Sequence, residues 1–222
     1  MGIVGTMLSW PRRIRDAVRL EGPWRLVLRV LVSPVYGAVG VHVQPLECEP
    51  YELGPLPAPT GVRKMTGDDI EALLAFRPEY RREQLWERLR SGHECFMSLV
   101  GDDLASCRWI CTGEARVGSL GLVLPLRRDE VFLYEVYTHA NYRGRRINRE
   151  AWNAMVEEYL GRGALALVGF TTVGRKPYGR NDRRNVATIR SLRLGPFKRL
   201  WVRTYGPQAE SWSERLRELR WA

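Results

Sequence analysis

The spacing of apolar positions divides the chain into a basic arm, a linker and a region of alternating helices and strands. Residues 10–32 carry apolar residues at nearly helical spacing with arginines between them, although Gly22 and Pro23 break the run. Residues 45–59 contain five prolines, which predicts neither a helix nor a central strand. We therefore expect an N-terminal amphipathic arm (1–44), a linker (45–60), a main domain (61–204) and a C-terminal helical tail (205–222).

The first half of the main domain predicts a strand, two helices and a series of strands. A short strand at 61–65 precedes Thr66, which is suited to cap a helix whose first turn holds Asp68 and Asp69. Pro78 ends that helix, and residues 79–90 predict a second, highly charged one. Apolar runs then predict antiparallel strands at 95–100, 104–111, 115–124 and 131–138, the first two joined by a Gly-Asp-Asp turn.

The second half begins where the apolar period becomes helical, at Arg145. This helix ends near Gly161 and Gly163, and residues 164–170 form a continuous apolar run that is typical of a strand buried on both faces. Residues 131–170 therefore predict a strand, a crossover helix and a parallel strand. Further on, the pattern predicts a basic loop at 174–184, a short helix at 185–194, a strand at 197–204 and a helix at 210–221.

Charge and cysteine usage limit the classes of partner and site. The 222 residues carry a formal net charge of +10, so the surface attracts phosphates, nucleic acid or anionic membranes. The four cysteines form no Cys-x-x-Cys pair and have no histidine at zinc-finger spacing, which favours reduced thiols over a metal site. The apolar stretch 26–43 is interrupted by Arg29 and Pro34, so we expect no transmembrane helix.

The most informative segment runs from Tyr134 to Asn148. A strand leads through a glycine-containing, arginine-rich turn directly into a helix. Unpaired backbone N–H groups and the helix dipole then point at one place. The segment therefore predicts an anion site suited to a phosphate.

This segment resembles the acyl-CoA-binding motif of the GNAT acetyltransferase superfamily, in which a strand and a turn lead into Arg/Gln-x-x-Gly-x-Gly/Ala at a helix start. Arg143 occupies the first motif position, whereas Arg146 stands where the family prefers glycine and Asn148 where it prefers glycine or alanine. Residues 62–69 resemble the family's first strand and helix start, and residues 185–192 resemble its last cofactor-side helix. The resemblance covers about residues 61–204.

The resemblance implies an α/β (α+β) fold with a mixed, mostly antiparallel central sheet, flanking helices and a splayed pair of parallel strands. It also implies acetyl-CoA or another acyl-CoA as co-substrate, with the pantetheine arm paired to backbone groups of the strand that precedes the motif. The cofactor-binding residues expected on this basis are Val136, Tyr137, Thr138, Arg143, Gly144, Arg145, Arg146, Ile147, Asn148 and Asn185.

The implied activity is N-acyl transfer to an amine of a small molecule, an amino sugar or a peptide. Because the amine must lose a proton, a carboxylate near the splayed strands is needed, and Glu135 is the first candidate and Glu130 the second. Glu135 could instead pair with an arginine and only hold structure. The family's thiolate-protonating tyrosine is replaced here by Leu192, and the substitutes considered are Tyr178 and Tyr205; His42, His93 and His139 show no catalytic partner pattern.

Two other functions remain open at this stage. The departures at Arg146, Asn148 and Leu192 are compatible with a non-catalytic GNAT-like module, and the basic loop at 175–184 with a nucleic-acid binder, although a specific nucleic-acid partner is not expected. The arm at 10–32 suggests packing on its own domain or on a second copy in a homodimer, with weak membrane-surface contact as the alternative. We expect a cytoplasmic protein, peripheral to a membrane if the arm binds one.

Overall fold

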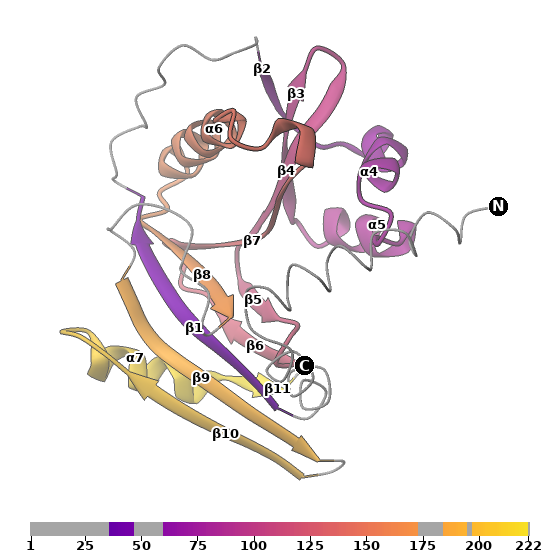
Figure 1. The fold of residues 1–222 in the computed structure, drawn as a ribbon. Helices are drawn as coiled ribbons and strands as arrows, with labels where there is room; N and C mark the ends of the chain where they lie inside the picture. Colours follow the sequence, from indigo (N-terminus) through magenta and orange to yellow (C-terminus); the bar gives the residue numbers. More distant parts are fainter. Residues whose placement is uncertain (1–35, 47–59, 173–183, 195–196, 222) are drawn as a thin grey trace.

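The computed structural model describes residues 36–46, 60–172, 184–194 and 197–221, and eight strands among them form one mixed sheet (Figure 1). Its strand order is β10-β9-β1-β8-β7-β4-β3-β2, and a smaller sheet has the order β11-β6-β5. All pairs are antiparallel except β7 and β8, which run parallel. This confirms the mixed, mostly antiparallel fold that the sequence predicts.

The elements have the following bounds. The main sheet consists of β1 (Tyr36–Pro45), β2 (Thr60–Lys64), β3 (Glu94–Val100), β4 (Asp103–Cys111), β7 (Glu130–Thr138), β8 (Ala166–Thr172), β9 (Arg184–Leu194) and β10 (Phe197–Thr204). The small sheet consists of β5 (Glu114–Val117), β6 (Leu122–Pro125) and β11 (Arg220–Trp221). The helices are α4 (Ile70–Phe76), α5 (Arg82–Arg90), α6 (Ile147–Gly161) and α7 (Ala209–Arg215), with short 3-10 turns at Gly67–Asp69, Ala140–Tyr142 and Leu216–Glu218.

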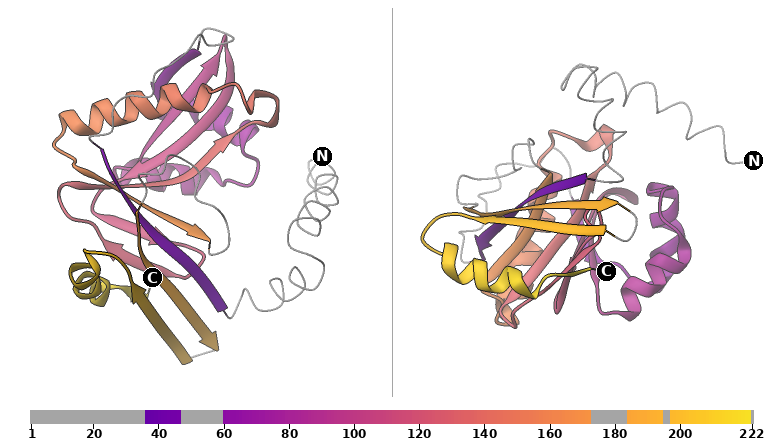
Figure 2. Two further views of the ribbon diagram at one scale, coloured as in Figure 1. Left: turned by 60° about the vertical axis from the view of Figure 1, so that its left-hand side comes forward. Right: turned by 90° about the horizontal axis from the view of Figure 1, so that it is seen from below.

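One half of the sheet, β2, β3, β4 and β7, lies between α6 on one face and α4 with α5 on the other (Figure 2). Alternation along β4 explains both layers, because successive side chains of a strand point to opposite faces. Trp109 of β4 packs in the cluster that holds Leu73 of α4 and Leu85 of α5. Its neighbour Ile110 packs with Met155 of α6. The centre of this half is therefore buried on both faces.

The 3-10 turn Gly67–Asp69, which leads directly into α4, is fixed by a capping box, as the sequence predicts from Thr66. The Thr66 backbone N–H donates to a carboxylate oxygen of Asp69 at 2.8 Å, and Arg63 donates to both Asp69 oxygens at 2.5 and 2.6 Å. These bonds, led by the one from Arg63 and opposed by burial, lower the pKa of Asp69 to about 2. The carboxylate is therefore ionised whenever the protein is folded at ordinary pH.

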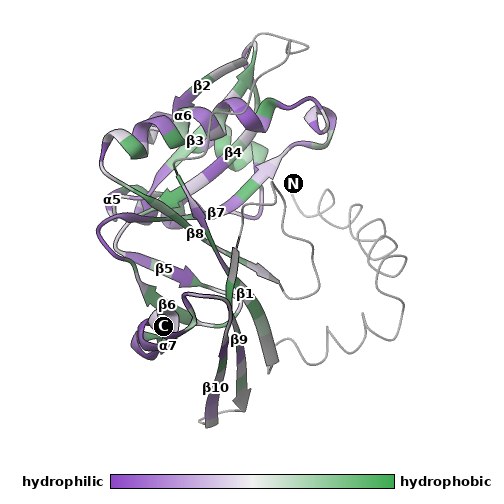
Figure 3. Ribbon diagram, turned by 90° about the vertical axis from the view of Figure 1, so that its left-hand side faces the viewer, coloured by the Kyte–Doolittle hydropathy of each residue, from purple (hydrophilic) through white to green (hydrophobic). Residues whose placement is uncertain are grey.

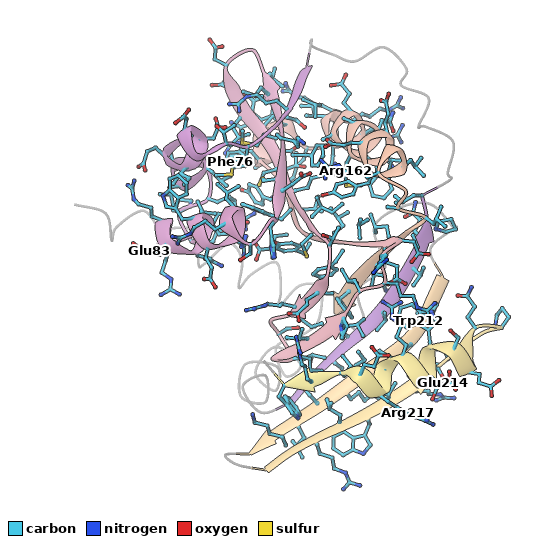
Figure 4. The ribbon with its side chains drawn as sticks, turned by 180° about the vertical axis from the view of Figure 1, so that it is seen from behind. Phe76, Glu83, Arg162, Trp212, Glu214 and Arg217 are labelled. Carbon is cyan, nitrogen blue, oxygen red and sulfur yellow. The ribbon has the colours of Figure 1, made fainter. Side chains whose placement is uncertain are left out.

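The other half of the sheet contains a strand that the sequence analysis did not predict. Residues 36–44 of the expected arm and Pro45 of the expected linker form β1 between β8 and β9, with Val41 opposite both Phe170 and Ala187. The short helix α7 lies across β9 and β10, and Trp212 faces the sheet (Figure 4). It packs with Leu122 and Ile189 in a second core.

Three predicted elements need correction. The helix expected at 185–194 is wrong, because these residues form β9 and pair with β1 and β10; β-branched Val186, Thr188 and Ile189 favour a strand there. The single strand expected at 115–124 is the hairpin β5–β6, whose turn contains Gly121 at a φ of 61°. The C-terminal helix is shorter than expected, since α7 passes through a 3-10 turn into β11.

Several predictions fall on residues outside the described ranges. They are the arm at 10–32, the linker residues 47–59, the basic loop at 174–183 with Tyr178, and Cys48. Cys95, Cys107 and Cys111 are buried free thiols. Among the described residues, no helix combines the length and the apolar character that crossing a membrane requires.

Candidate functional site

The parallel strands β7 and β8 separate soon after they begin. They pair only from Glu130, opposite Ala166, to Phe132, opposite Val168. β7 continues to Thr138 and β8 to Thr172, but within the described residues no further pairing joins them (Figure 1). The edge of β7 that faces β8 therefore leaves backbone donors and acceptors available to an extended ligand.

A β-bulge interrupts β7 in this unpaired stretch. Cys107 and Trp109 of β4 face Tyr137 and Tyr134, so Glu135 and Val136 together face one β4 residue, Arg108. Glu135 has a φ of 49°, which a non-glycine residue adopts only when its surroundings hold it there. Val136 is 45% exposed. The bulge thus presents its backbone at the point where β7 has left β8.

The turn between β7 and α6 forms a cationic cradle, by which we mean residues 143–148. Gly144 and Arg146 have φ values of 77° and 61°, and this alternation turns successive N–H groups towards one side. Within the described residues, no hydrogen bond is found from the backbone N–H groups of residues 144–148. Figure 3 shows this turn as hydrophilic, and the side chains of Arg143, Arg145 and Arg146 are exposed.

The two departures from the family motif have structural explanations. Arg146 occupies a left-handed backbone position, where a glycine would avoid about 1 kcal/mol of strain, and its side chain points to solvent. Asn148 lies in the first turn of α6, and its carbonyl and side-chain oxygens both accept hydrogen bonds from the guanidinium of Arg108. Arg108 is only 1% exposed. Neither residue therefore places a side chain over the unbonded N–H groups.

On the opposite face of β7, Glu135 is held by two residues of the α4–α5 side. Arg88 donates to its two oxygens at 2.7 and 2.8 Å, and the Tyr80 hydroxyl donates to one of them at 2.6 Å. Burial raises the pKa of Glu135, but the bonds from Arg88 and Tyr80 outweigh it, so the pKa lies below its usual value. These contacts favour the alternative that the sequence left open, a structural ion pair, and a role as base stays a prediction.

The structure does not bring all predicted site residues together. Glu130 lies at the paired end of β7 and β8, buried in an ion pair with Arg215 of α7. Asn185 lies on β9, which β1 and β8 separate from β7, and its side chain is outside the described part. The Tyr205 hydroxyl donates to Thr188 of β9. Of the predicted residues, Glu135 to Thr138 and Arg143 to Asn148 are the ones that share one region.

His93 and Tyr134 form a contact that sequence analysis missed. His93 Nδ1 lies 2.5 Å from the Tyr134 hydroxyl, and the Tyr134 ring stacks on Phe132, which meets Phe170 of β8 edge-on. Burial, followed by the charges of Arg88 and Arg116, lowers the pKa of His93, and burial raises the pKa of Tyr134. Both groups are therefore neutral, and they share one hydrogen bond whose direction is set by the imidazole tautomer. No spacing links residues so distant in sequence, so no pattern could reveal the pair.

A cavity of about 450 Å³ lies between α4, the β3–β4 turn and the segment that follows β7. Its lining includes Phe76, Asp102, Asp103, His139 and Asn141. The Phe76 ring meets Tyr137 edge-on at 5.4 Å, so the cavity adjoins β7 just beyond the bulge. A hollow of this volume fits a small molecule.

Comparisons with known proteins give one family and several structures of low sequence identity. A protein from Novosphingobium aromaticivorans, described as a putative acetyltransferase from the GNAT family, has 13% identity and a TM-score of 0.46 over 77% of this chain and 66% of its own. A predicted acetyltransferase from Clostridium acetobutylicum, solved with acetyl-CoA, has 15% identity and a TM-score of 0.41 over 56% of this chain and 91% of its own.

A functionally unknown conserved protein from Staphylococcus epidermidis has 10% identity and a TM-score of 0.44 over 69% of this chain, which spans 58% of that protein. Among curated proteins, none matches the sequence. The family model described as the acetyltransferase (GNAT) family matches residues 68–177, which contain the parting strands, the bulge and the cradle. The chain belongs to the GNAT acetyltransferase family.

Proposed function

We propose that the protein is an N-acetyltransferase that moves an acetyl group from acetyl-CoA to the amine of a small molecule. The observation that carries this proposal is the parting of β7 from β8 after Phe132, which leaves a free strand edge leading directly to the cradle. An acyl-CoA has two parts that fit these features, a linear amide-containing arm and a pyrophosphate. Family membership supports the same assignment, since the GNAT family uses acyl-CoA.

Each part of the co-substrate has a place in this arrangement. The pyrophosphate binds the unbonded N–H groups of residues 144–148, with Arg143, Arg145 and Arg146 adding charge. The pantetheine amides pair with the edge of β7 at Val136 and Thr138, as a short added strand would; at Thr138 they replace the hydrogen bond that Arg143 Nε donates to the carbonyl at 3.0 Å. The thioester then lies near the bulge, where the β4–β7 ladder is interrupted.

Acetyl transfer forms one bond and breaks another. The amine nitrogen attacks the thioester carbon, the C–N bond forms, the C–S bond breaks, and CoA leaves as a thiolate. The amine proton must go to a protein group or to water. Glu135 is a weak acceptor because Arg88 and Tyr80 lower its pKa. The lowered pKa of His93 keeps its imidazole neutral, and we assign the proton to it by way of the Tyr134 hydroxyl.

The acceptor is proposed to enter from the α4 side of β7. The cavity beside Phe76 adjoins Tyr137, one residue beyond the bulge, and its size fits a small molecule. Asp102 and Asp103 are among its lining residues, and their carboxylates would attract an amine carried by a cationic molecule. An amino sugar or another small amine therefore fits better than a long peptide.

The test is release of free CoA thiol from acetyl-CoA in the presence of a panel of small amines and amino sugars. The proposal expects amine-dependent thiol release that Tyr134→Phe reduces strongly, with Thr188→Val as a control that removes a hydroxyl contact on β9. Saturable binding of acetyl-CoA without thiol release for any amine would instead support a non-catalytic module. No binding of acetyl-CoA would refute both.

A further inference from the structure

Arg108 is the one arginine of the β4 strand, and its position in the fold is unusual for a charged residue. It lies opposite the bulge of β7, is 1% exposed, and points to the α6 side of the sheet. Within the described residues, no aspartate or glutamate forms an ion pair with it, and its buried Nε has no hydrogen-bond partner. A buried charge without a counter-ion is unfavourable, which calls for a compensating group.

The contacts that Arg108 does make lead to the start of α6. Its guanidinium donates to the carbonyl and side-chain oxygens of Asn148 and lies 6.0 Å from the Trp152 ring. These groups are neutral. Burial lowers the pKa of Arg108 to about 9, so the guanidinium is still charged at neutral pH. A full positive charge therefore lies beneath the positive end of a helix dipole.

Two further observations at the same turn indicate where an anion that compensates Arg108 would bind. The N–H groups of residues 144–148 have no hydrogen-bond acceptor within the described structure, and three exposed arginines surround them. Glu150 is the one acidic residue in the first turn of α6. One of its carboxylate oxygens is buried without a hydrogen-bond partner, but Glu150 is not among the groups that perturb Arg108. Within the described residues, therefore, neither the N–H groups of the cradle nor the guanidinium of Arg108 is paired with a carboxylate.

We propose that Arg108 is a binding determinant of the cradle, a buried cation whose counter-ion is the pyrophosphate of the bound co-substrate and which draws the Asn148 side chain inward to keep the cradle open. This inference rests on the proposed function for the identity of the ligand. It adds a residue from β4, distant in sequence from the motif, to the phosphate site. It also explains how asparagine replaces a smaller residue at position 148.

The experiment measures thermal unfolding of the full-length protein with and without inorganic pyrophosphate, and with and without CoA. The variants are Arg108→Met, which keeps an unbranched apolar side chain and removes the guanidinium charge, and Asn148→Ala, which keeps the charge. Arg190→Met, an exposed arginine of β9, is the control. Titration calorimetry with CoA gives the affinities.

If the proposal holds, Arg108→Met without ligand unfolds at the wild-type temperature or above it, because an uncompensated charge has been removed. Its affinity for CoA falls about tenfold, because the attraction of a buried cation for the negative charge of the ligand is lost, and its stabilisation by pyrophosphate shrinks. Asn148→Ala loses less affinity than Arg108→Met, and Arg190→Met behaves as wild type.

A structural role predicts the opposite pattern: Arg108→Met without ligand unfolds several degrees lower, and the stabilisation by pyrophosphate is unchanged. That result overturns the inference, and so does a wild-type protein that pyrophosphate and CoA fail to stabilise. If Arg108→Met does not fold, Arg108→Lys decides, since it keeps the charge and must retain most of the affinity for CoA. Thiol release is measured separately, so an inactive protein that shows the expected binding pattern contradicts only the proposed function.

Discussion

The two faces of β7 each hold a largely buried arginine, and the two arginines differ in what compensates their charge. On the α5 side, Arg88 makes two hydrogen bonds to Glu135 and lies over the rings of Tyr80, Trp109 and Tyr134. On the α6 side, Arg108 contacts only neutral groups of Asn148 and the ring of Trp152. An arginine that is paired with a carboxylate of the same chain stabilises the fold, whereas an arginine without a counter-ion in the chain is available to an anionic ligand.

The largest expected effect concerns the proton-accepting pair on the α5 side. Tyr134→Phe keeps the ring that stacks on Phe132 and removes the hydroxyl, and it should lower kcat about 100-fold, a typical contribution of proton transfer. His93→Gln should have a similar effect, and the KM for acetyl-CoA should change little in both variants. Steady-state kinetics of thiol release measure this. Wild-type kcat in both variants would leave the α5 face with a structural role only.

The same pair predicts a pH dependence. Burial and the charges of Arg88 and Arg116 lower the pKa of His93, so the imidazole becomes an acceptor above a pKa that lies below about 6.5. The value of kcat/KM should therefore rise with pH through that pKa and reach a plateau near neutrality. Tyr134→Phe should remove this rise from the residual rate. An unchanged profile in that variant would mean that another group titrates.

Glu135→Leu removes the carboxylate that pairs with Arg88 and leaves the Arg88 guanidinium buried without a counter-ion. The expected loss is about 2 kcal/mol in the free energy of unfolding, below that of a fully buried pair because Glu135 is 37% exposed. Urea unfolding measures it. Glu71→Leu is the control, since its pair with Arg82 is exposed and should matter far less. If Glu135→Leu costs no more than Glu71→Leu, the contrast between the two arginines fails.

Asp69→Asn tests a second compensated charge on the same side, at the start of α4. It should cost about 1 kcal/mol of unfolding free energy, the usual value of a helix cap. Because the folded pKa of about 2 is below the unfolded value, the carboxylate stabilises the fold above the unfolded pKa, and this is lost as pH falls from about 4 towards 2. Unfolding of wild type and variant should therefore converge as the pH falls below about 2. A difference that persists there would argue against the ion pair.

The smallest effect is a gain on the α6 side. Arg146 has a φ of 61°, so Arg146→Gly should raise the unfolding free energy by about 0.5 kcal/mol, the relief of strain being partly offset by the entropy of glycine. Urea unfolding checks this, with Arg145→Gly as the control that relieves no such strain. A loss of stability in Arg146→Gly would show that its side chain supports the cradle.

The sequence predicted the parts of the site that depend on local chemistry. The motif from Tyr134 to Asn148 indicated the strand, the turn and the helix, and the Thr66 cap indicated the start of α4. Two kinds of feature could not be predicted from the sequence. The pairing of β1 and β9 depends on long-range contacts, and Asn185 to Leu194 has no pattern that excludes a helix until its neighbours are known.

Contacts between distant residues could not be predicted either. Arg108 and Asn148 are 40 residues apart, and His93 and Tyr134 are 41 apart. Arg108 looks like any arginine in a basic chain until its burial is known. The strand alternation of β4 was the one available signal, because it places Arg108 on the same face as Ile110, which packs in the cluster that holds Met155 of α6.

Acetyl-CoA is proposed to bind the free edge of β7 and the cradle on the α6 side. Amide hydrogen exchange with and without acetyl-CoA tests it most directly, since the N–H groups of residues 144–148 lack acceptors in the described structure. We expect acetyl-CoA to slow exchange in residues 133–148 and to leave exchange in α5, residues 82–90, unchanged. Saturable binding that protects another segment and leaves residues 133–148 unprotected would contradict it.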